Sequence, residues 1–242
     1  MRARTPSRSP LGHSTDRIAL FSSDFLQQLV IALPAILLAL TLHEVAHGWV
    51  ADKLGDPTAR LLGRLSLNPL VHLDPMGTLA FVLSLAAGMG FGWAKPVPVD
   101  ARNLARPRRD MMWVALAGPA TNFLLAIASL VVYVHMQRFG LDAGLVGEPL
   151  GLMLRASFTI NTALAAFNLI PILPFDGGRI LAGLLPARLA WQYQRSEPYG
   201  FFIVLGLIIL GWLRWIMWPI YTTLLAAELA LVRNLLRLMG IL

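Results

Sequence analysis

The chain has 242 residues, of which 57% are hydrophobic and only 14% are charged. Soluble domains carry about 25% charged residues, so this composition excludes an ordinary soluble enzyme. The mean hydropathy of +0.65 and several long uncharged runs indicate an integral membrane protein with room for about four to six spans. The absence of cysteine excludes disulfides, thiolate metal sites and cysteine nucleophiles, so any metal must bind to His, Asp or Glu.

The net charge of +7 is also typical of nucleic-acid-binding proteins. In a chain this apolar, however, Lys and Arg concentrate in cytoplasmic loops and near anionic lipid. We therefore expect the lipid bilayer as a partner and no nucleic acid.

The N-terminal residues 1–24 are basic and rich in Ser and Pro, which predicts a disordered tail and not a signal peptide. Residues 25–242 are expected to form a single transmembrane domain, with a core at 25–178 and C-terminal helices at 179–242. The first span is predicted from Phe25 to Val50.

The region after the first span predicts irregular structure next to the membrane. Ala51–Pro75 is mixed and charged, as in a loop. Met76–Met89 is apolar but too short for an ordinary span, which favours a re-entrant or interfacial segment. In Gly90–Pro107, alternating apolar residues and prolines predict a short β-hairpin.

Two further spans are expected at Met111–Met136 and Gly151–Ile172, and a short surface helix at Ile180–Trp191. Tyr199–Val232 is too long for one straight span and is interrupted by Arg214 and Pro219, which predicts a helical hairpin. The predicted fold is an all-α polytopic membrane protein with about five to six transmembrane helices, a re-entrant segment and a short membrane-associated β-hairpin.

The sequence HEVAH, His43–His47, lies inside the first span. Two His residues four positions apart share one helix face and can bind one Zn²⁺, while Glu44 lies beside the site as a base. In a soluble helix this short pattern also arises by chance. In a membrane helix, His and Glu are costly unless they bind something, which favours a metal site.

A tetrahedral zinc site needs a third protein ligand and an open position. His13, His72, His135 and a few acidic residues are candidates. Asp176 is the strongest, because it follows an apolar span whose end is broken by prolines and because Gly177 and Gly178 permit a turn after it. A helix stop rich in Pro and Gly is the alternative interpretation of this segment.

Five motifs, in this order along the chain, resemble those of the site-2 proteases, the intramembrane zinc metalloproteases of peptidase family M50. They are HEVAH, LDPMGT at 73–78, GWAKPVPV at 92–99, AGPATN at 117–122 and NLIPILPFDGG at 168–178. The resemblance implies His43, His47 and Asp176 as ligands of one Zn²⁺ per chain, Glu44 as general base and Asn168 as a polar group near the scissile carbonyl. It also implies that the substrate is a transmembrane protein. Among the site-2 proteases, this sequence resembles the short form, which has no PDZ domain and no C-terminal regulatory domain.

The ligand geometry constrains the topology. His43 and Asp176 each lie near the end of a span, so the two spans must run in the same direction to share a metal. One crossing, Met111–Met136, achieves this if Met76–Met89 enters the membrane and returns. Most of the 20 Lys and Arg residues then face the cytoplasm, which predicts an active site near the cytoplasmic face of a bacterial-type cell membrane.

Two other polar residues lie in predicted spans. Asn122 is expected to hydrogen-bond across helices or to support the active site. Glu228 has no obvious partner, although Arg214 and Arg233 are candidates. A zinc transporter or sensor that uses the same ligands without hydrolysis is the alternative function, and a base held beside the ligands argues against it.

Overall fold

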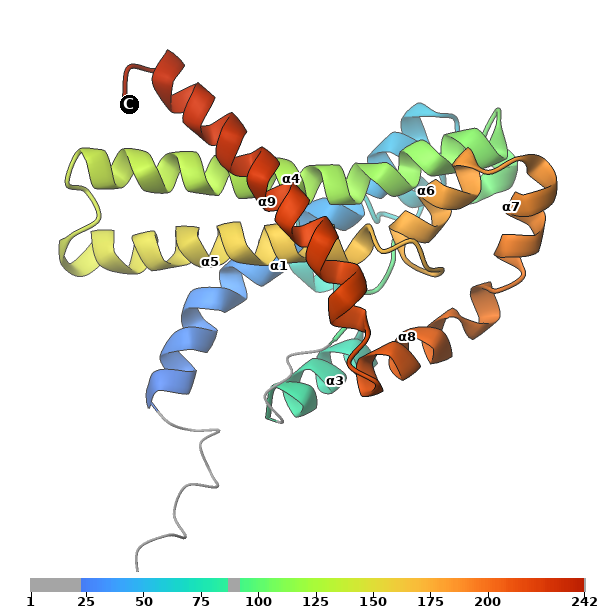
Figure 1. Ribbon diagram of the computed structural model, residues 1–242, viewed down its shortest axis with the longest axis horizontal. Coiled ribbons are helices and arrows are strands. Elements are labelled where there is room, and N and C mark those ends of the chain that lie inside the picture. The colour runs from blue at the N-terminus through green and yellow to red at the C-terminus, as the bar shows by residue number, and fades with distance from the viewer. Residues whose placement is uncertain (1–22, 87–91, 242) are drawn as a thin grey trace, which may run out of the picture.

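The computed structural model describes residues 23–86 and 92–241, and this part of the chain is predominantly helical (Figure 1). The predicted tail falls almost wholly in residues 1–22, outside the described part. The elements, in chain order, are the α-helices and short 3-10 helices α1 (Ser23–Lys53), α2 (Thr58–Leu61), η2 (Pro69–His72), α3 (Pro75–Ala86), η3 (Ala101–Asn103), α4 (Pro107–Arg138), α5 (Gly144–Asn168), α6 (Asp176–Leu184), α7 (Ala187–Gln194), η4 (Glu197–Tyr199), α8 (Gly200–Ile209) and α9 (Leu213–Leu238).

Four helices in the described part are long and apolar enough to cross a membrane: α1, α4, α5 and α9. The chain is therefore an integral membrane protein by length and composition of its helices. The expectation of five to six spans is wrong. Gly211, with a φ of +70°, separates α8 from α9, and the 10 residues of α8 rise only about 15 Å, half of the hydrocarbon thickness.

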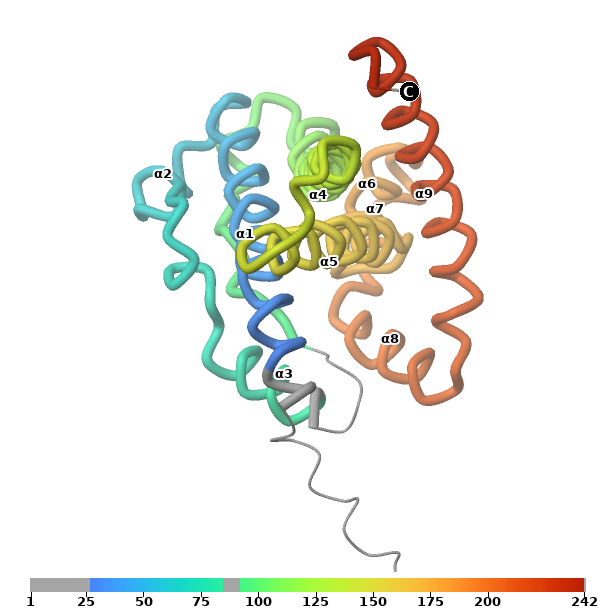
Figure 2. Tube along the Cα trace, turned by 90° about the vertical axis from the view of Figure 1, so that its left-hand side faces the viewer, coloured from blue at the N-terminus to red at the C-terminus, as the bar shows by residue number. Residues whose placement is uncertain are grey.

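The antiparallel pair α4 and α5 forms the centre of the molecule, with α1 on one side and α9 on the other (Figure 2). Small residues line these contacts and let the backbones approach closely, as is usual between membrane helices. They include Ala35 and Ala39 of α1, Ala115, Gly118 and Ala126 of α4, and Ala165 and Ala166 of α5, all buried.

The predicted β-hairpin in Gly90–Pro107 is wrong for the part that is described, because residues 92–107 contain no strand. One isolated antiparallel bridge joins Leu73 to Ala94, and the Lys95 N–H donates to the His72 carbonyl at 2.8 Å. Pro96 and Pro98 have no N–H to donate, so a regular ladder cannot continue through this segment.

The apolar run after residue 75 forms α3, and residues 87–89 of that run lie outside the described part. The 12 residues of α3 rise about 18 Å, which is too little to cross a bilayer. Asp74 stabilises the start of the helix, since its Oδ1 accepts the Gly77 N–H at 2.7 Å.

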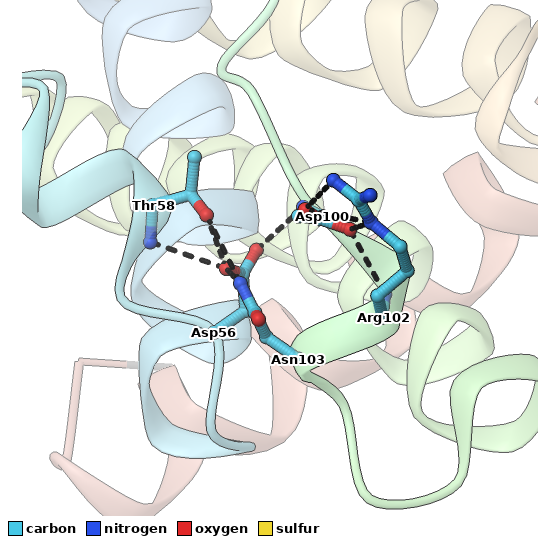
Figure 3. A network of polar contacts seen from close by, with 5 residues as sticks. All are labelled: Asp56, Thr58, Asp100, Arg102 and Asn103. Atoms are coloured by element: carbon cyan, nitrogen blue, oxygen red, sulfur yellow. Dashed lines mark hydrogen bonds and ion pairs between the residues drawn. The ribbon is translucent and has the colours of Figure 1, made fainter.

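A polar network joins the end of α1 to the chain after the extended segment 92–99 (Figure 3). The fully buried Asp56 carboxylate accepts the Asp100 N–H at 2.7 Å and the Asn103 Nδ2–H at 2.8 Å. Thr58 donates both its N–H and its hydroxyl to the same carboxylate. The network fixes the chain directly after segment 92–99 against the chain that follows α1.

Candidate metal centre

Three side chains from two distant parts of the sequence converge beside α4. His43 and His47 project from successive turns of α1, and their Nε2 atoms lie 3.0 Å apart. Asp176 Oδ2 lies 3.2 Å from His43 Nε2 and 3.3 Å from His47 Nε2. Both imidazoles are buried, and no other group of three or more potential ligands comes together among the described residues.

The start of α6 places Asp176 in this cluster. Asp176 is the first residue of the helix, and Gly177 and Gly178 are helical and buried. A Cβ at Gly177 would collide with the carbonyls of Leu169 and Ile170, and one at Gly178 would lie 2.5 Å from the Leu173 nitrogen. The expected turn after Asp176 is thus wrong. The two glycines serve instead to let α6 pack closely against the chain that follows α5.

The other nitrogen of each imidazole is fixed by an acceptor on α4. His43 Nδ1 lies 2.6 Å from Asn122 Oδ1, and His47 Nδ1 lies 2.7 Å from the Val114 carbonyl oxygen. A neutral His that donates through Nδ1 carries its lone pair on Nε2. Both lone pairs therefore point into the cluster, toward Asp176.

This arrangement fits a metal ion. Two imidazole lone pairs and a carboxylate oxygen would repel one another without a cation, and Asp176 Oδ2 is buried with no hydrogen-bond donor. Gly118 of α4 leaves space beside them, because a Cβ there would lie 2.6 Å from His43 Nε2. Two His and one carboxylate form a known catalytic zinc set with an open position.

Glu44 lies next to the cluster without joining it. Its Oε2 accepts the Val97 N–H at 2.7 Å, so the extended segment 92–99 holds the carboxylate in place. Glu44 lines the same cavity of about 540 Å³ as His43, His47 and Asp176. A carboxylate in this position can exchange a proton with a molecule in the cavity.

Asn168, at the last turn of α5, lines this cavity as well. Its Nδ2 donates to the Leu164 carbonyl at 3.0 Å. An amide nitrogen carries two N–H groups, so one remains for another acceptor. All five predicted site residues thus border one cavity.

The other polar residues that the sequence singled out are not ligands in the cluster. His72 is buried with Nε2 2.8 Å from the Ser66 carbonyl oxygen, outside the cluster. Glu228 contacts Thr162 of α5 at 2.7 Å, so neither suggested arginine is the partner that the structure gives it. Asn122 hydrogen-bonds across helices as expected, since its Nδ2 donates to Asn161 Oδ1 at 2.8 Å, and its Oδ1 also lies 2.6 Å from His43 Nδ1.

Sequence reasoning missed three features of the site: the space at Gly118, the Val97 N–H and the contact of Asn122 with Asn161. Only a polar residue within an apolar span could have indicated Asn161. The Val97 contact depends on tertiary structure and has no local signal.

The family model for peptidase family M50 matches residues 31–148 and 150–211, which include every residue of the cluster. The chain belongs to peptidase family M50. It is 37% identical over 206 residues to the "Putative zinc metalloprotease YwhC" of Bacillus subtilis, a match that covers 84% of this chain and 90% of that protein.

Two other relatives carry zinc metalloprotease names. The chain is 30% identical to the "Putative zinc metalloprotease Rip2" of Mycolicibacterium smegmatis, over 79% of this chain and 72% of the relative. It is 28% identical to the "Zinc metalloprotease MJ0392" of Methanocaldococcus jannaschii, over 69% of this chain but only 34% of that longer protein. No solved structure matches the chain. As an M50 peptidase whose cluster lies among apolar helices, the protein is an intramembrane zinc metalloprotease.

Proposed function

We propose that the protein hydrolyses peptide bonds of membrane-spanning proteins within or near the bilayer, with one Zn²⁺ per chain bound by His43, His47 and Asp176. The observation that carries this proposal is the convergence of three acceptor atoms within 4.8 Å of one another, with Glu44 lining the same cavity outside the ligand set. A membrane helix retains such costly residues when they have a function.

Bound at this site, zinc supplies a Lewis acid that activates water and polarises the scissile carbonyl. Glu44 accepts a proton from the attacking water and returns it to the nitrogen of the leaving amine. The Val97 N–H, which donates to Glu44 Oε2, holds this carboxyl group in the cavity. Asn168 Nδ2 donates to the carbonyl oxygen as negative charge develops on it.

The substrate must reach the cavity in an extended form, because a helix hides its peptide bonds. Segment 92–99 borders the cavity, where an extended peptide could add to it as a strand. The structure limits this role: the Lys95 and Val97 N–H groups are already bonded, and Pro96 and Pro98 have none. The carbonyl groups of this segment can still accept hydrogen bonds from a substrate. Its main contribution is to hold Glu44.

For topology, we propose that α3 enters the membrane without crossing it. Segment 92–99 then lies on the side of the membrane on which α1 ends. α1 and α5 then run in the same direction, with α4 as the single crossing between them. The basic residues from the last residue of α1 to the first turn of α4 would then share one side: Lys53, Arg60, Arg64 and the five from Lys95 to Arg109. By the positive-inside rule, these charges support a metal cluster near the cytoplasmic face of a bacterial-type cell membrane.

The predicted hairpin of two spans at Tyr199–Val232 would return Arg233 and Arg237 to the cytoplasmic side, whereas the single span α9 does not. Because α8 does not cross, α9 runs opposite to α5 and its end lies outside, together with Arg233 and Arg237. Without these two arginines, the predicted orientation depends mainly on the basic residues from the end of α1 to the first turn of α4.

A zinc transporter or sensor would use the same three ligands. It would need no base in the cavity, whereas Glu44 lines the cavity and is held by a backbone N–H. The position of Glu44 favours hydrolysis.

The direct test uses detergent-purified protein reconstituted into lipid vesicles with a panel of tagged single-span membrane proteins. We expect about one zinc per chain and cleavage of at least one member within or near its span. Chelation should stop cleavage, and added Zn²⁺ should restore it. Stoichiometric zinc without cleavage of any substrate, combined with zinc flux across the vesicles, would favour the transporter.

The topology is tested by single cysteines in this cysteine-free chain. Cysteines at Thr58 and Ala105 should be labelled from the cytoplasm, and one at Ala143 from outside. Ala182 is buried, so the exposed Leu184 of the same helix takes its place as a third cytoplasmic position. In a simple up-and-down bundle α3 would cross and Ala105 would lie outside. External labelling at Ala105 would therefore overturn the re-entrant arrangement.

A further inference from the structure

A continuous chain of hydrogen bonds runs from the metal cluster into the interface between α4 and α5. It begins at His43 Nδ1, which lies 2.6 Å from Asn122 Oδ1. Asn122 Nδ2 donates to Asn161 Oδ1 at 2.8 Å, and Asn161 Nδ2 donates to the Ser157 carbonyl at 2.9 Å. The hydroxyl of Ser157 contacts that of Ser129 at 2.8 Å.

Both asparagines are buried among membrane helices, with Asn122 0% and Asn161 1% exposed. Unsatisfied polar groups are costly there, because neither water nor lipid can replace a lost partner. The orientation of each amide is therefore determined by its neighbours in the protein.

Backbone carbonyls set the direction of the chain, since a carbonyl oxygen can only accept. The Ser157 carbonyl requires the NH₂ group of Asn161 on its side, which leaves Asn161 Oδ1 toward Asn122. The Ala39 carbonyl of α1, 3.3 Å from Asn122 Nδ2, requires the NH₂ group of Asn122 in the same way. Asn122 Oδ1 then faces His43, which must donate from Nδ1 and keep its lone pair on Nε2.

The contribution of Asn161 can be judged by considering the Asn122 amide rotated by 180°. Rotation would place Asn122 Oδ1 against two acceptors, the Ala39 carbonyl and Asn161 Oδ1, and would place an NH₂ group against His43 Nδ1. The Ala39 contact is the longer of the two, so Asn161 provides the stronger constraint. Metal ligands in general depend on such outer partners for their tautomer and orientation.

We propose that Asn161 is a positioning residue for the metal centre: through Asn122 it holds His43 in the tautomer that presents Nε2 as a zinc ligand. This proposal rests on the proposed zinc site but concerns a residue that touches neither metal nor substrate. It also gives α5 a second role besides carrying Asn168.

The test compares three variants of the full chain. Asn161→Leu keeps an approximately similar shape but removes the acceptor for Asn122. Asn161→Asp keeps a carboxyl oxygen facing Asn122. Thr162→Val, the matched control, removes the neighbouring buried bond on α5, the contact with Glu228 of α9, and leaves the chain to His43 intact.

Zn²⁺ affinity is measured by competition with a chelator, and the geometry of the site is read from the absorption spectrum of the Co²⁺-substituted protein. We expect Asn161→Leu to weaken Zn²⁺ binding roughly tenfold and to change the Co²⁺ spectrum. Asn161→Asp should stay closer to wild type, and Thr162→Val should match wild type in both measurements.

Wild-type affinity and spectrum in Asn161→Leu would overturn the proposal, and so would an equal loss in Thr162→Val, which would indicate a general effect on helix packing. If Asn161→Leu does not accumulate in the membrane, Asn161→Ala replaces it with the same expectation. Wild-type protein that binds Zn²⁺ but cleaves nothing would contradict the proposed function without touching this inference. Wild-type protein that binds no Zn²⁺ would overturn both.

Discussion

Asp176 and Asp56 are both carboxylates in partly or fully buried positions, yet their surroundings are opposite in character. Asp56 receives four donors, two from Thr58 and one each from Asp100 and Asn103 (Figure 3). Asp176 Oδ2 receives none and faces two imidazole nitrogens. A carboxylate saturated with donors needs nothing further, whereas one that faces other lone pairs requires a cation.

The two regions also cooperate. The Asp56 network anchors Asp100 and Asn103, directly after segment 92–99, and that segment supplies the Val97 N–H to Glu44. Burial tends to raise the pKa of Asp56, but the bonds from Thr58, Asn103 and Asp100 outweigh it and hold the pKa below its ordinary value. In Asp100, hydrogen bonds from Arg102 lower the pKa to about 2. One region is thus a scaffold and the other a reaction centre.

The largest expected effect is the loss of zinc in Asp176→Ala, compared with the separate variant Asp56→Ala. Asp176→Ala should lose zinc and reduce cleavage to background, because two imidazoles alone leave the site incomplete. Asp56→Ala should keep its zinc, measured by metal analysis of the purified protein. If the two variants lost zinc equally, the distinction between scaffold and ligand would fail.

Glu44→Gln tests the part of the reaction centre that is not a ligand. The amide cannot accept the water proton, so cleavage of a tagged membrane substrate should fall at least about a hundredfold. Zinc content should stay near one per chain. Loss of zinc from this variant would show that Glu44 is a ligand and that the assigned role is wrong.

Gly118→Ala tests the space reserved beside the imidazoles. The added Cβ would lie 2.6 Å from His43 Nε2, so the ring must shift and Zn²⁺ affinity should fall on the order of 10- to 100-fold. The matched variant is Gly206→Ala in α8, where a Cβ meets nothing within 4 Å. Unchanged affinity in Gly118→Ala would mean that this space is not part of the site.

The smallest effect concerns the scaffold and its pH dependence. Asp56→Asn puts an NH₂ group against existing donors, which should cost about 1–3 kcal/mol of unfolding free energy in detergent. Because the folded pKa of Asp56 is lowered, its stabilisation is complete above the ordinary value of 3.8 and is lost as the pH falls toward the folded value.

The wild type should accordingly lose stability below about pH 4, and Asp56→Asn should show a flatter profile. Asp52→Asn, which breaks an ion pair with the exposed Arg60, is the control, with an effect of about 0–1 kcal/mol. Thermal unfolding across this pH range distinguishes them. An equal slope in wild type and Asp56→Asn would assign the acid sensitivity to other groups.

The sequence predicted the parts of the site that depend on local geometry. His43 and His47 share a helix face by spacing alone, and the proline-rich break before Asp176 indicated a residue at the end of a span. The roles of Gly177 and Gly178 could not be predicted, because a glycine that permits a turn and one that permits close packing look the same in sequence.

The errors in the fold have physical causes of the same kind. Alternation in Gly90–Pro107 favoured a hairpin, but the Lys95 and Val97 N–H groups donate to the His72 carbonyl and to Glu44 and not to a second strand of the same segment. The apolar length of Tyr199–Val232 favoured two spans, yet α8 ends after 10 residues and α9 alone is long enough to cross. Hydrophobicity fixes how much chain prefers lipid but not where a turn divides it.

The bond between Val97 and Glu44 gives the protein a built-in isotopic reporter. Pro96 and Pro98 carry no amide hydrogen, so Val97 is an isolated exchangeable position in the middle of segment 92–99. Its hydrogen is shielded from deuterium for as long as Glu44 accepts it. Deuterium uptake at this single amide, followed while a substrate or inhibitor occupies the cavity, therefore registers whether the carboxylate has turned away from the backbone.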